Sequence, residues 1–244
     1  MSVICQSELP EDMRVERPLP GVQPLHMQDW LRVDDVYGAQ MAERERLMAQ
    51  VPDLVRAQMP GAGPACAEAL ELVLQQLRSM DGFERREDMM RCPDRRTVDL
   101  RADPLMVLGA LIQEDICILQ KPSGSEEHIL SAAILCFPSH WTLSEKIGRA
   151  MGRIHRPVSE YDENIRRRVQ RLCDGVKVGR PLWRFNHASA QGALFQPRSE
   201  QDPPIETGQV ERKYQRAERQ SLLRLPQSKA IVFSIHTYVV ALSP

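Results

Sequence analysis

The hydrophobic pattern of this chain changes period near residue 112, and this change constrains the fold more than any single motif does. Before that point apolar residues recur at helical spacing, and after it short apolar runs of strand type prevail. Residues 115–120 and 129–137 are two such runs around Pro122-Ser-Gly-Ser, which predicts an antiparallel hairpin with a longer loop. Residues 230–240 are the clearest strand of the chain. The sequence therefore predicts an α+β fold, in which helices precede an antiparallel sheet that further helices interrupt.

Six segments have the spacing or the terminal signals of helices: residues 37–50, 64–80, 104–111, 143–151, 161–173 and 211–222. Asp103-Pro104 is an N-cap and first-turn pair at the start of the third. Alternation predicts a strand at residues 182–187, and three prolines among polar residues predict a mobile loop at 197–210. We expect residues 1–33 to be an extended lead-in with four prolines and residues 34–244 to form one domain.

The composition bounds the class of protein. With 244 residues and a net charge of −1, the chain gives no global argument for binding nucleic acid or membrane. No run approaches the roughly 20 apolar residues of a transmembrane helix, and the polar N-terminus lacks the apolar core of a secretory signal. The six cysteines include no C-x-x-C pair, so the spacings of zinc sites, disulfide frameworks and c-type haem attachment are absent. We therefore expect a cytoplasmic protein.

The motifs of the commonest enzyme classes are missing from the sequence. There is no Walker A loop, no G-x-G-x-x-G, no G-x-S-x-G elbow and no H-E-x-x-H. Their absence disfavours nucleotide enzymes, hydrolases and metalloproteases.

One passage holds the residues best suited to chemistry: His140, Trp141, Lys146 and His155. Pro157 restricts the backbone just after His155, so this imidazole is a candidate ligand for a metal or a haem. The alternative is loop packing, which is the commoner role of a lone histidine. Trp141 suits the core or the wall of a cofactor site.

The cationic side chains also have two interpretations. Lys146, Arg184 and Arg224 are solvated surface charges by default, and the pattern alone favours that interpretation. In an anion-binding pocket they would instead pair with a carboxylate, such as a haem propionate.

Three blocks of sequence, with an Arg184-x-Asn186 element between the second and the third, resemble a known family. The blocks are Gln113-Glu114-Asp115-Ile116-Cys117-Ile118-Leu119; Phe137-Pro138-x-x-Trp141 with Lys146-x-Gly148 and Ile154-His155-x-Pro157-Val158; and Arg216-Ala-Glu218-Arg219-Gln220-Ser-Leu222-x-Arg224-Leu225-Pro226, which leads into Ile231-Val-Phe233-Ser-Ile235-x-Thr237-Tyr238. They are similar to the haem-dependent oxidative N-demethylase alpha-subunit-like family, and the resemblance extends over roughly residues 20 to 240.

The resemblance implies a PAS-like antiparallel sheet with flanking helices and an N-terminal helical segment, enclosing haem b. The implied activity is that of a monooxygenase, the oxygen-dependent removal of a methyl group from a small secondary amine such as dimethylamine, which releases formaldehyde. Electrons would come from a reductase subunit that carries FMN and an iron–sulfur cluster, and ultimately from NADPH. The family also implies a helical C-terminal portion beyond this sequence.

Within this resemblance, His155 is the expected axial ligand of the iron, because it stands in the block that matches best. The expected partners of the propionates are Lys146, Arg184 and Arg224, and Trp141 would be a wall of the pocket. The chain departs from the family at His187, where an aromatic residue is expected, and at His236, where an arginine is expected.

Three hypotheses of function remain open at this point. The first is a haem-binding oxidoreductase subunit that acts on a small methylated amine. The second is a non-enzymatic PAS-like sensor of haem or another ligand, which would lack reductase coupling. The third is a haem-free interaction protein that keeps only the fold.

Overall fold

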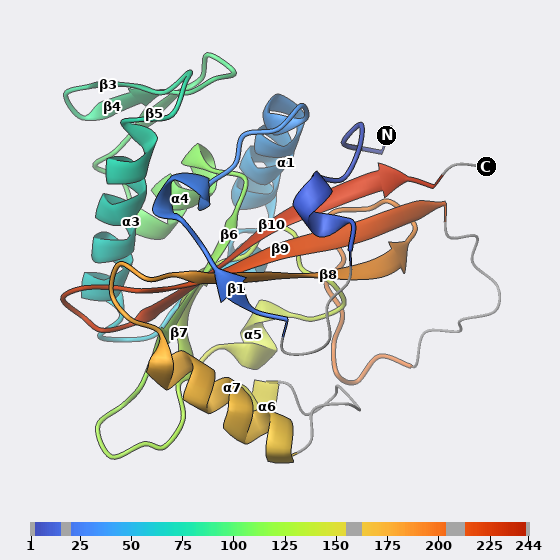
Figure 1. Ribbon diagram of the computed structural model, residues 1–244. Coiled ribbons are helices and arrows are strands. Elements are labelled where there is room, and N and C mark those ends of the chain that lie inside the picture. The colour runs from blue at the N-terminus through green and yellow to red at the C-terminus, as the bar shows by residue number, and fades with distance from the viewer. Residues whose placement is uncertain (1–2, 16–20, 155–162, 204–212, 243–244) are drawn as a thin grey trace.

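A computed structural model of the chain describes residues 3–15, 21–154, 163–203 and 213–242. A seven-stranded sheet runs through the centre (Figure 1), and every pairing between its strands is antiparallel. In spatial order the strands are β1 (Gln23–Pro24), β8 (Leu182–Ala190), β9 (Tyr214–Arg224), β10 (Ile231–Ala241), β6 (Asp115–Gln120), β7 (Ile129–Ile134) and β2 (Arg56–Gln58). The predicted α+β class is confirmed, whereas the PAS type of the sheet stays a prediction.

Helices cover both faces of this sheet (Figure 1). The face that we call the upper face carries α1 (Tyr37–Gln50), α3 (Gly63–Leu77) and α4 (Pro104–Leu111). The lower face carries α5 (Leu143–Lys146), α6 (Met151–Ile154) and α7 (Glu163–Gly175). The short helix α2 (Pro52–Val55) precedes β2, and a small sheet of β3 (Glu84–Arg86), β4 (Met89–Arg91) and β5 (Thr97–Asp99) follows α3.

Local sequence signals account for most of these elements. Helix α1 has the predicted bounds, and α4 begins where predicted, with the side chain of Asp103 accepting a hydrogen bond from the Met106 amide at 3.2 Å. The hairpin of β6 and β7 and the strand β10 are also confirmed. Each sheet face has its own apolar core, and the smaller one lies between the lower face and α5–α7.

The helix predicted at residues 211–222 is wrong, because β9 occupies Tyr214–Arg224 and pairs with β8 and β10 along its whole length. Its many charged residues favoured the interpretation as a helix. Arg216 and Arg219 are instead buried, and their guanidinium groups donate to backbone carbonyls. Buried arginines whose terminal nitrogens are bound in this way hide the alternation of a strand.

The helix predicted at residues 143–151 is in fact two short helices. Gly148 lies between α5 and α6 with a φ of 74°, a left-handed conformation that breaks the helix and that glycine adopts readily.

The N-terminal segment packs on the upper face. Met13 and Trp30 are fully buried in its core, and the Trp30 indole donates to the Ser234 hydroxyl at 2.8 Å. The division into residues 1–33 and 34–244 stays a prediction. None of the described helices has the length and apolar content needed to span a membrane.

Candidate functional site

The lower face contains a hollow of about 160 Å³, which we call the lower-face hollow. Its lining is Ser139, Trp141, Asn186, Ala188, Arg216 and Glu218. The hollow therefore combines one aromatic ring with an amide, a hydroxyl and a pair of opposite charges.

Sheet register brings four of these residues together. Asn186 lies opposite Glu218, and Ala188 lies opposite Arg216, in the antiparallel pairing of β8 with β9. Because alternate residues of a strand share a face, all four side chains lie on one side of the sheet. They come from segments that are about 30 residues apart in the sequence.

The loop after β7 supplies the rest of the lining. Ser139 forms an isolated bridge with Gln196, and the amide of His140 donates to the Gln196 carbonyl at 2.9 Å. His140 has a left-handed φ of 60°, an uncommon conformation for a residue that is not glycine. This anchoring holds Ser139 and Trp141 against the hollow, while the His140 side chain is exposed.

Arg216 and Glu218 set the charge of the hollow. The Nη2 of Arg216 donates to the Phe137 carbonyl at 2.6 Å and its Nη1 to the Leu194 carbonyl at 3.0 Å. Its Nε lies 3.5 Å from Oε1 of Glu218, and among the described residues no acceptor forms a hydrogen bond with it. Burial lowers the pKa of Arg216, and the nearby Glu218 carboxylate partly opposes this effect.

Arg184 is two residues before Asn186 on β8, so it shares the face of the hollow. Its Nε is buried and has no hydrogen-bond partner among the described residues. Burial lowers the pKa of this guanidinium, with the Glu218 carboxylate acting in the opposite direction. A buried donor without an acceptor costs free energy. The Arg184 guanidinium is therefore suited to bind an anion that enters the site.

Lys146 is buried on α5, but it does not line the hollow and its ammonium is already bound. Its Nζ donates to the Ile154 carbonyl at 3.0 Å and to Oε1 of Glu200 at 2.5 Å. Lys146 thus ties α5 to the last residue of α6. His155, the predicted iron ligand, is the next residue of the chain and lies outside the described residues.

The structure does not bring Arg224 to the hollow. Its guanidinium donates to the carbonyls of Cys173, Val176 and Lys229 at 2.5, 2.6 and 2.7 Å. Six residues along β9 separate it from Glu218, which corresponds to about 20 Å at the rise of an extended strand. Arg224 therefore holds the end of α7 to the turn between β9 and β10.

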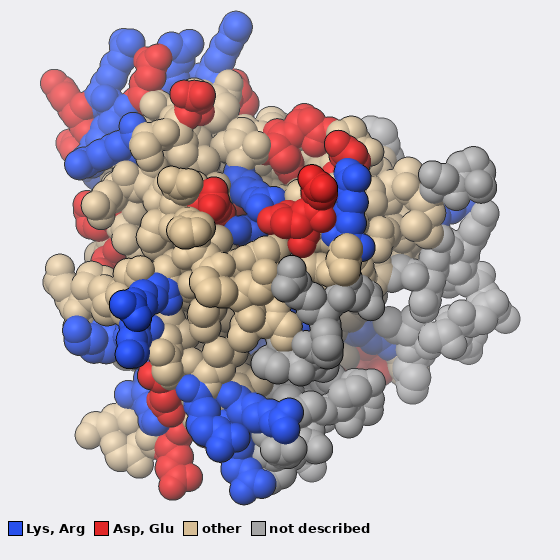
Figure 2. All heavy atoms as spheres, in the orientation of Figure 1, with Lys and Arg blue, Asp and Glu red and all other residues tan. Residues whose placement is uncertain are grey.

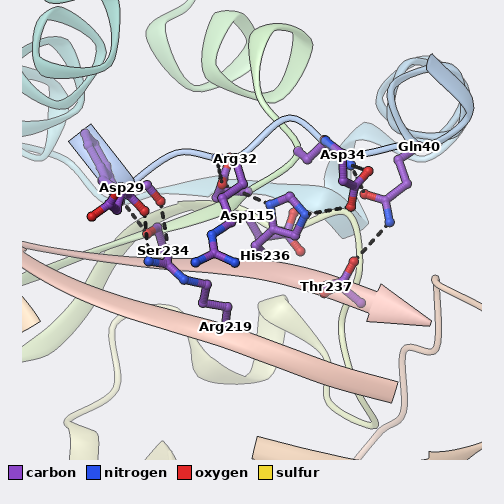
Figure 3. Close-up of polar contacts among 12 residues, drawn as sticks. Asp29, Arg32, Asp34, Gln40, Asp115, Arg219, Ser234, His236 and Thr237 are labelled. Atoms are coloured by element: carbon purple, nitrogen blue, oxygen red, sulfur yellow. Dashed lines mark hydrogen bonds and ion pairs between the residues drawn. The ribbon is translucent and has the colours of Figure 1, made fainter. Parts of the chain in front are cut away.

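The first three residues of the first sequence block, Gln113 to Asp115, form a hub of polar contacts on the upper face (Figure 3). Glu114 accepts hydrogen bonds from the Arg32 amide at 3.0 Å and from Nδ1 of His236 at 3.0 Å. Asp115 accepts from Arg44 at 2.6 Å and from the backbone amides of Cys136 and Phe137 at 2.7 and 2.8 Å. The hub ties the sheet to the segment that leads toward the hollow.

Both departures from the family pattern lie on the upper face, away from the hollow. His187 points to the opposite side of β8 from Asn186, contacts the ring of Phe185 and bonds the Met13 carbonyl at 2.9 Å. His236 lies between the carboxylates of Asp34 and Glu114. Neither histidine lines the hollow.

Trp141 as a wall residue and Asn186 as part of a motif are predicted from the sequence. Arg216 and Glu218 are not predicted as lining residues, because the sequence predicts a helix for their segment. The only signal for them was their place in the third block. In the described part of the chain no group of three His, Cys, Asp or Glu side chains could hold a metal ion.

The comparison with known families agrees with these blocks. The sequence profile described as "Haem-dependent oxidative N-demethylase, alpha subunit-like" matches residues 21–244. The match covers more than nine tenths of the chain and includes every residue that lines the lower-face hollow.

Proposed function

Because the chain belongs to the haem-dependent oxidative N-demethylase alpha-subunit-like family, we propose that it is a haem-binding oxidoreductase subunit for small methylated amines. The proposed reaction is the oxygen-dependent removal of a methyl group from a secondary amine of the size of dimethylamine, with release of formaldehyde. One observation carries the proposal. Residues from the second block, the Arg184-x-Asn186 element and the third block meet in a single hollow, although they are far apart in the sequence.

The side chains on the lower face fit the carboxylates of a haem. In this proposal Arg184 pairs with a propionate, since its buried Nε has no other acceptor among the described residues. His155 would be the axial ligand, and Lys146 would fix the backbone just before it through the Ile154 carbonyl. The haem would be b-type, because the chain has no C-x-x-C-H attachment motif. When bound, haem supplies oxygen activation, which protein side chains cannot.

The lower-face hollow is the proposed site of the amine. A volume of about 160 Å³ is below the roughly 300 Å³ at which sites for drug-sized ligands begin, so it suits a ligand of a few atoms. The Glu218 carboxylate would attract the ammonium, and the ring of Trp141 would face its methyl groups. In this proposal the hollow is only one part of the haem site.

The family description "alpha subunit" implies other subunits. We propose a reductase partner that carries FMN and an iron–sulfur cluster and draws on NADPH. These cofactors would reside on the partner and not on this chain.

The test combines reconstitution with hemin and a matched pair of variants. His155→Ala is expected to abolish or shift the Soret band, whereas His26→Ala, the same change at an exposed histidine, is expected to leave it unaltered. Dimethylamine-dependent oxygen uptake and formaldehyde release are then measured with a supplied reductase. An unaltered spectrum in His155→Ala would refute the ligand assignment. No turnover across a panel of methylamines, in a protein with a normal spectrum, would favour a haem sensor.

A further inference from the structure

A segment of strongly positive charge covers the lower face. Residues 163–180 contain six Lys and Arg residues and two Asp and Glu residues, which gives a net charge of +4. The net charge of the whole chain is −1, so the remainder carries −5. The positive charge is therefore concentrated in α7 and the turn that follows it.

The exposed cations of this segment include Arg168, Arg171, Lys177 and Arg180. In the part of the chain that the structure describes, no carboxylate forms an ion pair with any of them. The nearest acidic residue in the sequence, Asp174, is bound to Lys121 at 3.0 Å. Lys and Arg side chains gather over α7 in the lower part of Figure 2. We call these four residues the α7 patch.

The turn at the end of α7 adds an apolar anchor to the α7 patch. Lys177 and Arg180 form an isolated bridge, and between them Val178 is 47% exposed. A partner that covers the α7 patch would also bury this side chain.

The inner face of α7 belongs to the site already described. Val169 and Cys173 pack in the lower-face core, against which Trp141 and Ile154 also pack. The α7 patch is thus on the solvent side of α7 and of the turn that follows it. A partner docked there would lie close to the proposed haem site.

We propose that the α7 patch is the docking surface for an acidic protein, and that this protein is the electron donor of the chain. The identity of the donor rests on the proposed function, whereas the acidic character of the partner rests on the charge of the patch. A compact protein can cover the patch without meeting the acidic remainder of the chain. A long polyanion such as nucleic acid would be repelled by that remainder.

The probe for the test is a small [2Fe–2S] ferredoxin with an acidic surface, reduced and mixed with the haem-loaded full chain. The measured quantity is the second-order rate constant of haem reduction as a function of salt. Arg168→Glu/Arg171→Glu is expected to lower it at least about tenfold at low salt, because electrostatic steering raises association rates by 10 to 10³. The matched control is Arg78→Glu/Arg85→Glu, the same charge change at two exposed arginines, one just after α3 and one in the small sheet.

The control variant is expected to stay within about twofold of the wild type, and dithionite is expected to reduce all three proteins equally. Equal ferredoxin rates in the two variants would overturn the proposal, because net charge alone would then explain the effect. Tighter binding of a 20-bp DNA duplex than of ferredoxin would overturn it in favour of nucleic acid. If no Soret band forms, the proposed function fails, and calorimetric binding of ferredoxin to the haem-free chain still tests the patch.

Discussion

The buried His236 makes the stability of the protein depend on pH in a predictable way. Its Nδ1 lies 3.0 Å from Oε1 of Glu114 and its Nε2 lies 3.1 Å from Oδ2 of Asp34 (Figure 3). Burial alone lowers the pKa of this imidazole, but the two carboxylates outweigh it and raise the pKa from 6.5 to about 9. The same contact helps to lower the pKa of Asp34 to about 2, against the opposing effect of burial. The three groups therefore form a charged bridge between the N-terminal segment and β10.

The sign of the effect follows from the proton on His236. In the unfolded chain this proton leaves near pH 6.5, whereas the folded protein keeps it until about pH 9. Its contribution to stability is complete below pH 6.5 and is lost as the pH rises toward 9. The full contribution is about 3 kcal/mol, since each pH unit corresponds to about 1.4 kcal/mol. Between pH 7 and pH 8.5 we expect a loss of about 2 kcal/mol.

The assay is urea unfolding followed by circular dichroism at four pH values from 6 to 8.5. The comparison is with His236→Gln, which fills a similar space and does not titrate. Buried thiols and phenols with raised pKa values, such as those of Cys117 and Tyr238, are common to both proteins and cancel in the difference. The wild type should lose stability with rising pH and the variant should not. Equal slopes in the two proteins would refute the reasoning.

Three further predictions follow from the packing and the hollow. Asp115→Ala leaves the Arg44 guanidinium buried without its carboxylate, so we expect the free energy of unfolding in urea to fall by about 3–5 kcal/mol. A fall of less than about 1 kcal/mol would contradict a stabilising role for this ion pair. Gly109→Ala would place a Cβ 2.8 Å from Cγ1 of Ile134, so overpacking should lower the free energy of unfolding by about 1–3 kcal/mol in the same assay. An unchanged unfolding midpoint would contradict this, because it would mean that the neighbouring side chains move aside at no cost. Glu218→Gln should weaken calorimetric binding of dimethylammonium at least about tenfold, and unchanged affinity would place the amine elsewhere.

Elements whose signals are local could be predicted from the sequence. Helix α1 has apolar residues at helical spacing, and β6, β7 and β10 are mainly apolar runs of strand length. Strand β9 has neither signal. Arg216 and Arg219 look exposed in the sequence, and carbonyls of distant segments accept hydrogen bonds from them in the folded protein.

The candidate site was predicted in part for the same reason. Trp141 and Asn186 stand in recognisable motifs, and both line the hollow. The partner of Glu218 in the hollow is set by the register of β8 with β9, which no local pattern encodes. Arg224 looked like another propionate partner, but the end of α7 lies over it and occupies its guanidinium. Contacts between distant elements thus decide which cations remain available for a ligand.

The visible absorption spectrum of the purified protein, expressed with a haem precursor, tests the central claim most directly. Our account predicts a Soret band that shifts on reduction and that changes in His155→Ala. The absence of a Soret band, even after hemin is added, would contradict the assignment of haem chemistry to this chain and leave only the fold of the family.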